Sequence, residues 1–287
     1  MTRGGVRGLL GAACLVLAAL GLPPLAAGPA GAAGPVARAD GSSGPRVADV
    51  RHPVRLLLLG DSIALTLGKG LSVDARERYG VTVTDDATLG CDLDPQLEVF
   101  TSGAAGPATP GCDNWRGLWP FLIAGQRPQV VGLGLGRWEI ADHLLGGRWV
   151  HIGEPAWDGH LTDDLQSAIA ILDSFGAKVV LFTMPYVDPS ARQSDGLAWS
   201  ENTPTRVKAY NALVRQVART HPGVVSVIDL NRMLSPAGVY TASLSGVHVR
   251  SADGIHVSVD GGELLQRQIL PAVDRIGTEN EAAKVSP

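Results

Sequence analysis

Three side chains that together could carry out acyl transfer come from two distant parts of the sequence. Ser62 lies near one end, whereas Asp253 and His256 lie near the other. The turn between Asp253 and His256 contains Gly254, and this spacing can place the carboxylate against Nδ1 of the imidazole. Nε2 is then free to take the proton of a serine hydroxyl, which becomes a nucleophile toward esters. These residue types predict a serine hydrolase, provided that the fold brings them together.

Each of the two motifs also has an ordinary structural explanation. Gly60-Asp61-Ser62 is a common way to turn a chain and begin a helix. Asp253 to His256 could be a surface turn in which the aspartate caps the next few residues of the chain. One motif comes after the first buried strand and the other precedes the last predicted helix, and this coincidence favours the catalytic interpretation.

The serine lies where a strand is predicted to end. Leu56 to Leu59 follow one another without alternation, which is typical of a strand buried on both faces of a parallel sheet. Gly60 can take the tight turn, and Asp61 and Ser62 are good helix-starting residues. Backbone N–H groups at such a helix start can stabilise an oxyanion.

Strand and helix patterns alternate through the rest of the chain. Strands are predicted at residues 81–84, 129–135, 178–183 and 224–228, and helices at 67–79, 115–126, 161–175, 204–220 and 259–276. This order predicts a three-layer α/β/α sandwich with a central parallel sheet. Functional residues of such sheets gather at the carboxyl ends of the strands, where Ser62, Gly90, Gly136 and the segment before the last helix are expected.

The two ends of the chain differ in composition from the middle and are predicted to lie outside the folded domain. Residues 1–33 have early arginines, an apolar run and small residues, the order of a signal peptide or, if uncleaved, an N-terminal anchor. Residues 34–52 are predicted to be a flexible linker, 53–276 a single domain and 277–287 a disordered tail. We therefore expect a secreted, extracytoplasmic protein of the bacterial cell surface.

The net charge indicates which partners are excluded, and the two cysteines indicate the compartment. A net charge of −4 without a basic stripe argues against nucleic acid as a partner. In an oxidising compartment Cys91 and Cys112 are most simply a disulfide, which contributes roughly 3 kcal/mol by loop entropy. A catalytic thiol is the alternative, but neither cysteine has a histidine close by in the sequence.

No metal or cofactor is predicted. His143, His151 and His160 match no compact ligand spacing and are interpreted as loop histidines. His248 with Asp253 and His256 would need a further ligand. Among the tryptophans, Trp138 and the predicted loop from Trp149 to Trp157 could stack on a sugar or acyl group.

From the first strand to the last helix the chain resembles the SGNH (GDSL-type) hydrolases. The resemblance implies a flavodoxin-like fold and a triad of Ser62, Asp253 and His256. It also implies an oxyanion hole that includes the N–H groups of Ser62 and Gly90, the glycine of Thr88-Leu89-Gly90-Cys91.

A third block of that family pattern departs from its usual Gly-x-Asn-Asp. This chain has Gly136-Arg137-Trp138-Glu139, so an arginine brings charge and length where a neutral amide is usual. Arg137 could reach the oxyanion, or could pair with Glu139 or Asp142. Asp61, Trp138 and Glu139 are further candidates for substrate binding.

The blocks around the two cysteines are similar to extracytoplasmic SGNH domains associated with acyltransferase-3 proteins. That similarity implies an esterase or acyltransferase acting on O-acyl, particularly O-acetyl, esters of cell-surface glycans. A domain that binds glycan without turnover is the alternative, because of the altered third block. The expected partner is an acylated small molecule or glycan, with membrane contact only through an uncleaved N-terminal segment, and the protein is expected to be a monomer.

Overall fold

The computed structural model describes residues 49–108 and 111–285. The predicted signal peptide or anchor at residues 1–33 and most of the linker at 34–52 lie outside the described residues. Within the part of the chain that is described, no helix is long and apolar enough to cross a membrane.

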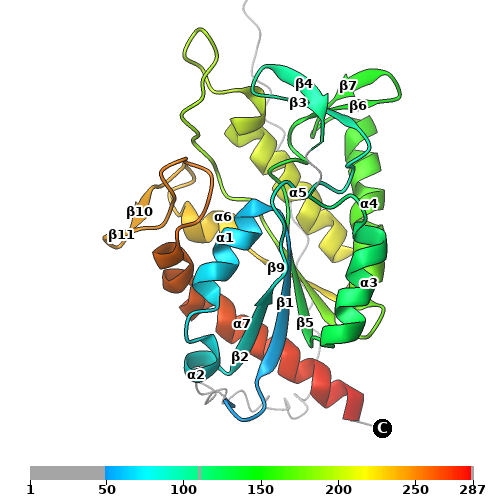
Figure 1. The fold of residues 1–287 in the computed structure, drawn as a ribbon, viewed down its shortest axis with the longest axis vertical. Helices are drawn as coiled ribbons and strands as arrows, with labels where there is room; N and C mark the ends of the chain where they lie inside the picture. The colour runs from blue at the N-terminus through cyan, green and yellow to red at the C-terminus, as the bar shows by residue number, and fades with distance from the viewer. Residues whose placement is uncertain (1–48, 109–110, 286–287) are drawn as a thin grey trace, which may run out of the picture. The chain divides into compact units, whose positions relative to one another are not determined.

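The centre of the molecule is a five-stranded sheet in which every neighbouring pair of strands is parallel. Its strand order is β2-β1-β5-β8-β9 (Figure 1). The strands are β1 (Val54–Gly60), β2 (Val81–Asp85), β5 (Val130–Gly134), β8 (Lys178–Phe182) and β9 (Val225–Ile228). Leu56 to Leu59 are buried, as expected for a strand covered on both faces. The predicted parallel sheet is therefore confirmed.

Helices cover both faces of this sheet (Figure 1). Helices α1 (Ser62–Leu71) and α7 (Val259–Val285) pack together on one face. Helices α3 (Trp115–Gln126), α4 (Pro155–Asp173) and α5 (Pro204–Arg219) cover the other. The short helices are α2 (Ala75–Tyr79), η1 (Ser200–Asn202) and α6 (Leu230–Leu234). The three-layer arrangement is the one that the alternating pattern predicted.

Two smaller sheets were not predicted. An antiparallel sheet of order β4-β3-β6-β7 lies beyond the carboxyl ends of the central strands, at the top of Figure 1. Its strands are β3 (Glu98–Thr101), β4 (Ala104–Pro107), β6 (Asp142–Leu145) and β7 (Arg148–Val150). Strands β10 (Ser243–Leu244) and β11 (Val247–His248) form a hairpin. These strands are too short, and β4 too rich in small residues, for a period-two pattern to reveal them.

Three predicted elements differ from the structure, and one of them, α4, begins at Pro155 instead of the predicted residue 161. The helix predicted over 67–79 is interrupted between α1 and α2, where Asp74 adopts a left-handed φ of 49°. The tail predicted to be disordered is helical through residue 285, since α7 continues past 276. Asn280 explains the longer helix, because its side chain is buried and its Nδ2 donates to the carbonyl of Gly176 at 2.8 Å.

Candidate active site

The turn that carries Ser62 is held tightly against the neighbouring strand. The N–H of Asp61 donates to the carbonyl oxygen of Gly134 at 2.9 Å. Gly60 has a φ of +130°, and a Cβ there would lie 1.9 Å from that same oxygen, so only glycine fits. The Asp61 carboxylate then accepts the N–H of Ile63 at 2.8 Å and caps α1. Ser62 is thereby fixed as the first residue of the helix.

Ser62 has its reactive groups unengaged. The side chain is 8% exposed, and no hydrogen bond within the described residues involves its hydroxyl or its backbone N–H. A helix start leaves such N–H groups without intrahelical partners. The hydroxyl is therefore available to a base and the N–H to an oxyanion.

Asp253 and His256 form the pair that their spacing predicted. Oδ2 of Asp253 lies 2.6 Å from Nδ1 of His256, and Oδ1 accepts the N–H groups of Ile255 and His256 at 2.8 and 3.0 Å. Partial burial acts to raise the pKa of Asp253, but these hydrogen bonds outweigh it and hold the pKa below its usual range. The aspartate is thus charged at neutral pH and orients the imidazole.

The second nitrogen of His256 faces into the protein. Nε2 is buried and has no hydrogen-bond partner among the described residues. The next residue, Val257, donates its N–H to Oγ1 of Thr66 at 3.3 Å, and that hydroxyl donates to the carbonyl of Ser62 at 2.9 Å. One side chain therefore links the histidine segment to the first turn of α1. Sequence analysis missed Thr66, although its position four residues after Ser62 places it above the serine on the helix.

Gly90 lies beside the end of β1. Thr88 donates its N–H to the carbonyl of Gly60 at 2.8 Å, and Gly90 is buried with a φ of +73°. Its N–H makes no hydrogen bond within the described residues. The next residue forms the predicted disulfide, which joins Cys91 to Cys112. The backbone of Gly90 is thus left with a free donor in a segment that the disulfide constrains.

The backbone of the third block is hydrogen-bonded to the turn that carries Ser62. The N–H of Arg137 donates to Oδ2 of Asp61 at 3.1 Å, and the N–H of Gly136 donates to Oε2 of Glu139 at 2.7 Å. Burial raises the pKa of Asp61, and it raises that of Glu139 well above its usual value, with Asp92 and Asp61 adding to the effect on Glu139. Asp61 and Glu139, which the sequence proposed for substrate binding, are 1% and 0% exposed and instead hold the backbone in place.

Two buried donors come next in the same block. Nη1 of Arg137 and Nε1 of Trp138 lack hydrogen-bond partners among the described residues. Burial lowers the pKa of Arg137, and the carboxylates of Glu201 and Asp61 offset only part of that effect. Each of these unpaired groups carries a desolvation cost that a substrate oxygen could relieve.

The predicted pairing of Arg137 with Glu139 or Asp142 is wrong. Asp142 forms an ion pair with Arg206 at 2.6 Å, and Glu139 accepts the N–H of Gly136. The carboxylate of Glu201 instead lies close enough to Arg137 to affect its pKa. The short helix η1, which carries Glu201, gave no sequence pattern that would have shown this.

The loop assignment of the histidines and tryptophans also needs correction. His143 lies in β6 and is fully buried, and His160 lies in α4, whereas His151 follows β7 in a loop. Trp157 is 0% exposed and stacks against His143 at 4.0 Å, so it cannot contact a sugar in this conformation. Trp149, on β7, is 42% exposed.

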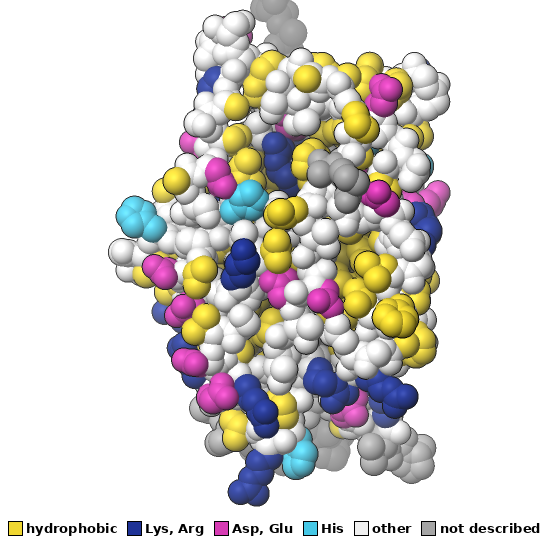
Figure 2. Space-filling view, in the orientation of Figure 1, with side chains coloured by type: hydrophobic (Ala, Val, Ile, Leu, Met, Phe, Trp, Pro, Cys, Tyr) yellow, Lys and Arg dark blue, Asp and Glu magenta, His cyan; other side chains and the backbone are white. Residues whose placement is uncertain are grey.

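Figure 2 shows the same side of the molecule as Figure 1. In the upper half of the view, histidine and basic side chains lie among hydrophobic ones. This part of the surface corresponds to the region above the carboxyl ends of the central strands in Figure 1.

Comparisons with known proteins agree on the fold. The family model described as "Protein of unknown function (DUF459)" matches residues 55–272. The structure of a carbohydrate acetylesterase family member from Sinorhizobium meliloti is similar, with 11% identity, a TM-score of 0.51 and coverage of 78% of this chain and 99% of that chain. No protein of curated function matches the sequence.

Two further solved structures resemble the chain. The acetyl xylan esterase AlAXEase has 15% identity and a TM-score of 0.48, and the match covers 77% of this chain and 100% of that chain. TesA has 19% identity and a TM-score of 0.47, with 77% of this chain and 99% of that chain covered. The predicted three-layer α/β/α fold with a central parallel sheet is confirmed.

Proposed function

The chain belongs to the family described as "Protein of unknown function (DUF459)", and we propose that it is a serine esterase that uses Ser62, His256 and Asp253. The observation that carries this proposal is the oriented histidine: Nδ1 of His256 is held by Asp253, while Nε2 is buried, unpartnered among the described residues and linked through Thr66 to the turn of Ser62. A histidine in this state is ready to accept a proton.

The reaction begins when Nε2 of His256 accepts the proton of the Ser62 hydroxyl. Oγ of Ser62 forms a bond to the ester carbonyl carbon, and the carbonyl electrons move to oxygen. The charged Asp253 stabilises the imidazolium that forms. His256 then protonates the leaving alcohol as its bond to the acyl carbon breaks. A water or a sugar hydroxyl then attacks the acyl carbon while His256 accepts its proton, and His256 gives this proton to Oγ of Ser62 as the bond between Oγ and the acyl carbon breaks.

The oxyanion is stabilised by backbone donors that the fold leaves free. The N–H groups of Ser62 and Gly90 make no hydrogen bond in the described residues and belong to segments fixed by the cap at Asp61 and by the disulfide. Nη1 of Arg137, buried without a partner in the described part of the chain, is the third donor. An arginine there brings positive charge where a neutral amide is usual, which suits an oxyanion.

The substrates we propose are O-acyl esters, particularly O-acetyl esters of cell-surface glycans. The support is the shared fold with a protein described as a carbohydrate acetylesterase family member, together with the exposed Trp149, whose ring could stack on a sugar. The disulfide supports an oxidising, extracytoplasmic location. Transfer of the acyl group to another hydroxyl uses the same residues as hydrolysis.

The test is hydrolysis of 4-nitrophenyl acetate by the wild type, Ser62→Ala and His256→Gln. Both variants should lose about 10⁴-fold or more in kcat/KM, because the triad acts as a unit. His248→Gln is the matched control, because His248 is an exposed histidine that contacts Ser243 through Nδ1. Equal rates for the wild type and Ser62→Ala would overturn the assignment.

A fluorophosphonate probe supplies a readout that does not depend on finding the natural ester. We expect one adduct, located on Ser62 by peptide mass spectrometry and absent in His256→Gln. Glycan binding without either ester turnover or labelling of Ser62 would instead favour a non-catalytic binding domain. Adding a sugar alcohol as acceptor and measuring acetylated sugar then separates transfer from hydrolysis.

A further inference from the structure

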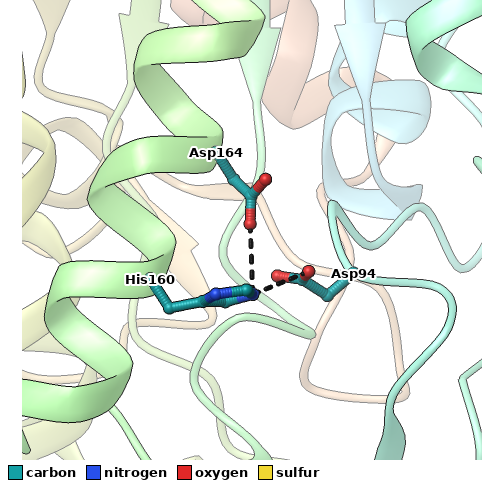
Figure 3. A group of neighbouring side chains, drawn as sticks. All are labelled: Asp94, His160 and Asp164. Atoms are coloured by element: carbon teal, nitrogen blue, oxygen red, sulfur yellow. Dashed lines mark hydrogen bonds and ion pairs between the residues drawn. The ribbon is translucent and has the colours of Figure 1, made fainter. Parts of the chain in front are cut away.

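A second cluster of histidine and carboxylates lies away from Ser62 and takes no part in the proposed reaction. Asp94, in the segment after Cys91, and His160 and Asp164, one turn apart on α4, point toward one another (Figure 3). Nε2 of His160 lies 2.9 Å from Oδ1 of Asp94 and 3.4 Å from Oδ2 of Asp164. The three potential ligand atoms lie within 4.8 Å of one another.

The carboxylates are not satisfied by the protein alone. Asp164 is 6% exposed, and its Oδ2, which faces the cluster in Figure 3, accepts no hydrogen bond in the described residues. Oδ2 of Asp94 is also buried without a hydrogen bond from those residues. Two carboxylates therefore converge on one imidazole nitrogen, which carries at most one proton. A cation would therefore stabilise these two carboxylates more than a single N–H group can.

A protonated His160 that bridges the two aspartates is the simplest alternative. Arg116 supports it, because Nη2 of Arg116 lies 2.5 Å from Oδ1 of Asp164 and neutralises part of the charge. The same contact, however, orients Asp164 so that its other oxygen faces His160. In metal sites, residues outside the ligand shell orient the ligating carboxylates in this way. Stacking of Trp157 on His160, with ring centroids 5.5 Å apart, fixes the imidazole as well.

We propose that Asp94, His160 and Asp164 bind one Zn²⁺ ion. One imidazole and two carboxylate oxygens form a ligand set that zinc accepts. The 3.4 Å between Nε2 and Asp164 equals the separation of about 3.4 Å expected between ligands in a tetrahedron with metal bonds of about 2.1 Å, and the 2.9 Å between Nε2 and Asp94 would have to lengthen on binding. A pocket of about 230 Å³ lies on the Asp94 side of the cluster and is lined in part by Asp94 and Arg116.

The ion would act on the segment that carries Gly90. Asp94 lies between the disulfide partner Cys91 and the start of α3, whereas His160 and Asp164 belong to α4. Zn²⁺ would therefore cross-link this segment to the helical layer, as structural zinc sites do. The proposed zinc site does not depend on the proposed esterase activity, because none of its three ligands takes part in that reaction.

The experiment is titration of ZnCl₂ into the chelator-treated full chain without an affinity tag, followed by calorimetry and thermal unfolding. We expect saturable binding of one Zn²⁺ per chain and a rise in Tm of a few degrees at saturation. His160→Gln and Asp94→Asn should each weaken the affinity for Zn²⁺ by at least about tenfold. His151→Gln is the matched control, because His151 also pairs with a carboxylate, that of Glu154 at 3.1 Å.

Two results would overturn the proposal. One is the absence of saturable Zn²⁺ binding by the wild type. The other is unchanged affinity in Asp94→Asn, which would place the ion elsewhere, for example on His256. Asp94→Asn decides the question even if His160→Gln does not fold, because Asp94 lies outside regular structure, and far-UV circular dichroism verifies the fold of each variant.

Discussion

His256 and His160, two of the histidines that face aspartates, differ in which ring nitrogen the carboxylates approach. At His256 the carboxylate of Asp253 lies on Nδ1 and leaves Nε2 without a partner among the described residues. At His160 the carboxylates of Asp94 and Asp164 both lie near Nε2. The first arrangement produces a base, because one nitrogen is oriented and the other is free. The second gathers three lone pairs at one point, as a cation requires.

The two arrangements also differ in how they are built. Asp253 and His256 lie within one short turn, whereas Asp94 and His160 are 66 residues apart and meet through packing. The short turn should survive changes elsewhere in the fold. The cluster depends on the segment held by the disulfide. Substitutions in one arrangement should therefore leave the other intact.

The largest effect should come from Asp253→Asn. An amide placed against Nδ1 would donate to it, move the imidazole proton to Nε2 and remove the base. We expect kcat for 4-nitrophenyl acetate to fall by about 10⁴-fold with an unchanged Tm. Asp94→Asn, the same change in the other cluster, should alter kcat by less than about threefold in metal-free protein. Equal losses of kcat in Asp253→Asn and Asp94→Asn would contradict the proposed difference between the two clusters.

The next effect concerns the third oxyanion donor. Arg137→Gln should lower kcat by about 10²- to 10³-fold with little change in KM, because the oxyanion exists only in the transition state. Trp138→Phe removes the other buried donor, Nε1, but keeps an aromatic ring, and its kcat should stay within a few-fold of wild type. A larger loss of kcat in Trp138→Phe than in Arg137→Gln would instead assign the third oxyanion donor to Trp138.

The disulfide should matter for stability. Replacing both Cys91 and Cys112 by serine should lower the free energy of unfolding by roughly 3 kcal/mol, measured by urea denaturation. It should also weaken Zn²⁺ binding, because Asp94 lies in the segment that the disulfide constrains. The His256–Asp253 turn should be unaffected, which an unchanged pH profile of the residual activity would show.

The smallest effect is a pH dependence of stability. Burial, with repulsion from Asp164, raises the pKa of Asp94 to about 6, above its unfolded value. The native state therefore binds more protons than the unfolded state between about pH 4 and about pH 6, and metal-free wild type loses stability as pH rises through this window. Asp94→Asn should lack this loss, which is on the order of 1 kcal/mol, when urea denaturation is compared at the two pH values. Parallel curves for both proteins would contradict it.

The sequence predicted the central sheet and the pairing of Asp253 with His256 because both depend on short-range patterns. A run of buried leucines from Leu56 to Leu59 is typical of an inner strand, and Asp253 reaches His256 within a single turn. The cap at Asp61 is equally local, since its carboxylate accepts the N–H of Ile63. Local geometry determines these features, so sequence reasoning could find them.

Contacts between distant segments were decided only by the tertiary structure. Nothing local indicates that the N–H of Arg137 meets Asp61, that Glu201 lies near Arg137, or that α4 brings His160 to Asp94. The interpretation of His160 as a loop histidine was wrong because α4 begins at Pro155, before the predicted start at residue 161. The sequence by itself determined the strands of the central sheet, the helix start at Ser62 and the turn at His256, since each has a short-range sequence pattern. Tertiary packing decided which buried groups meet and which stay unpaired, because burial and long-range distance exist only in the folded chain.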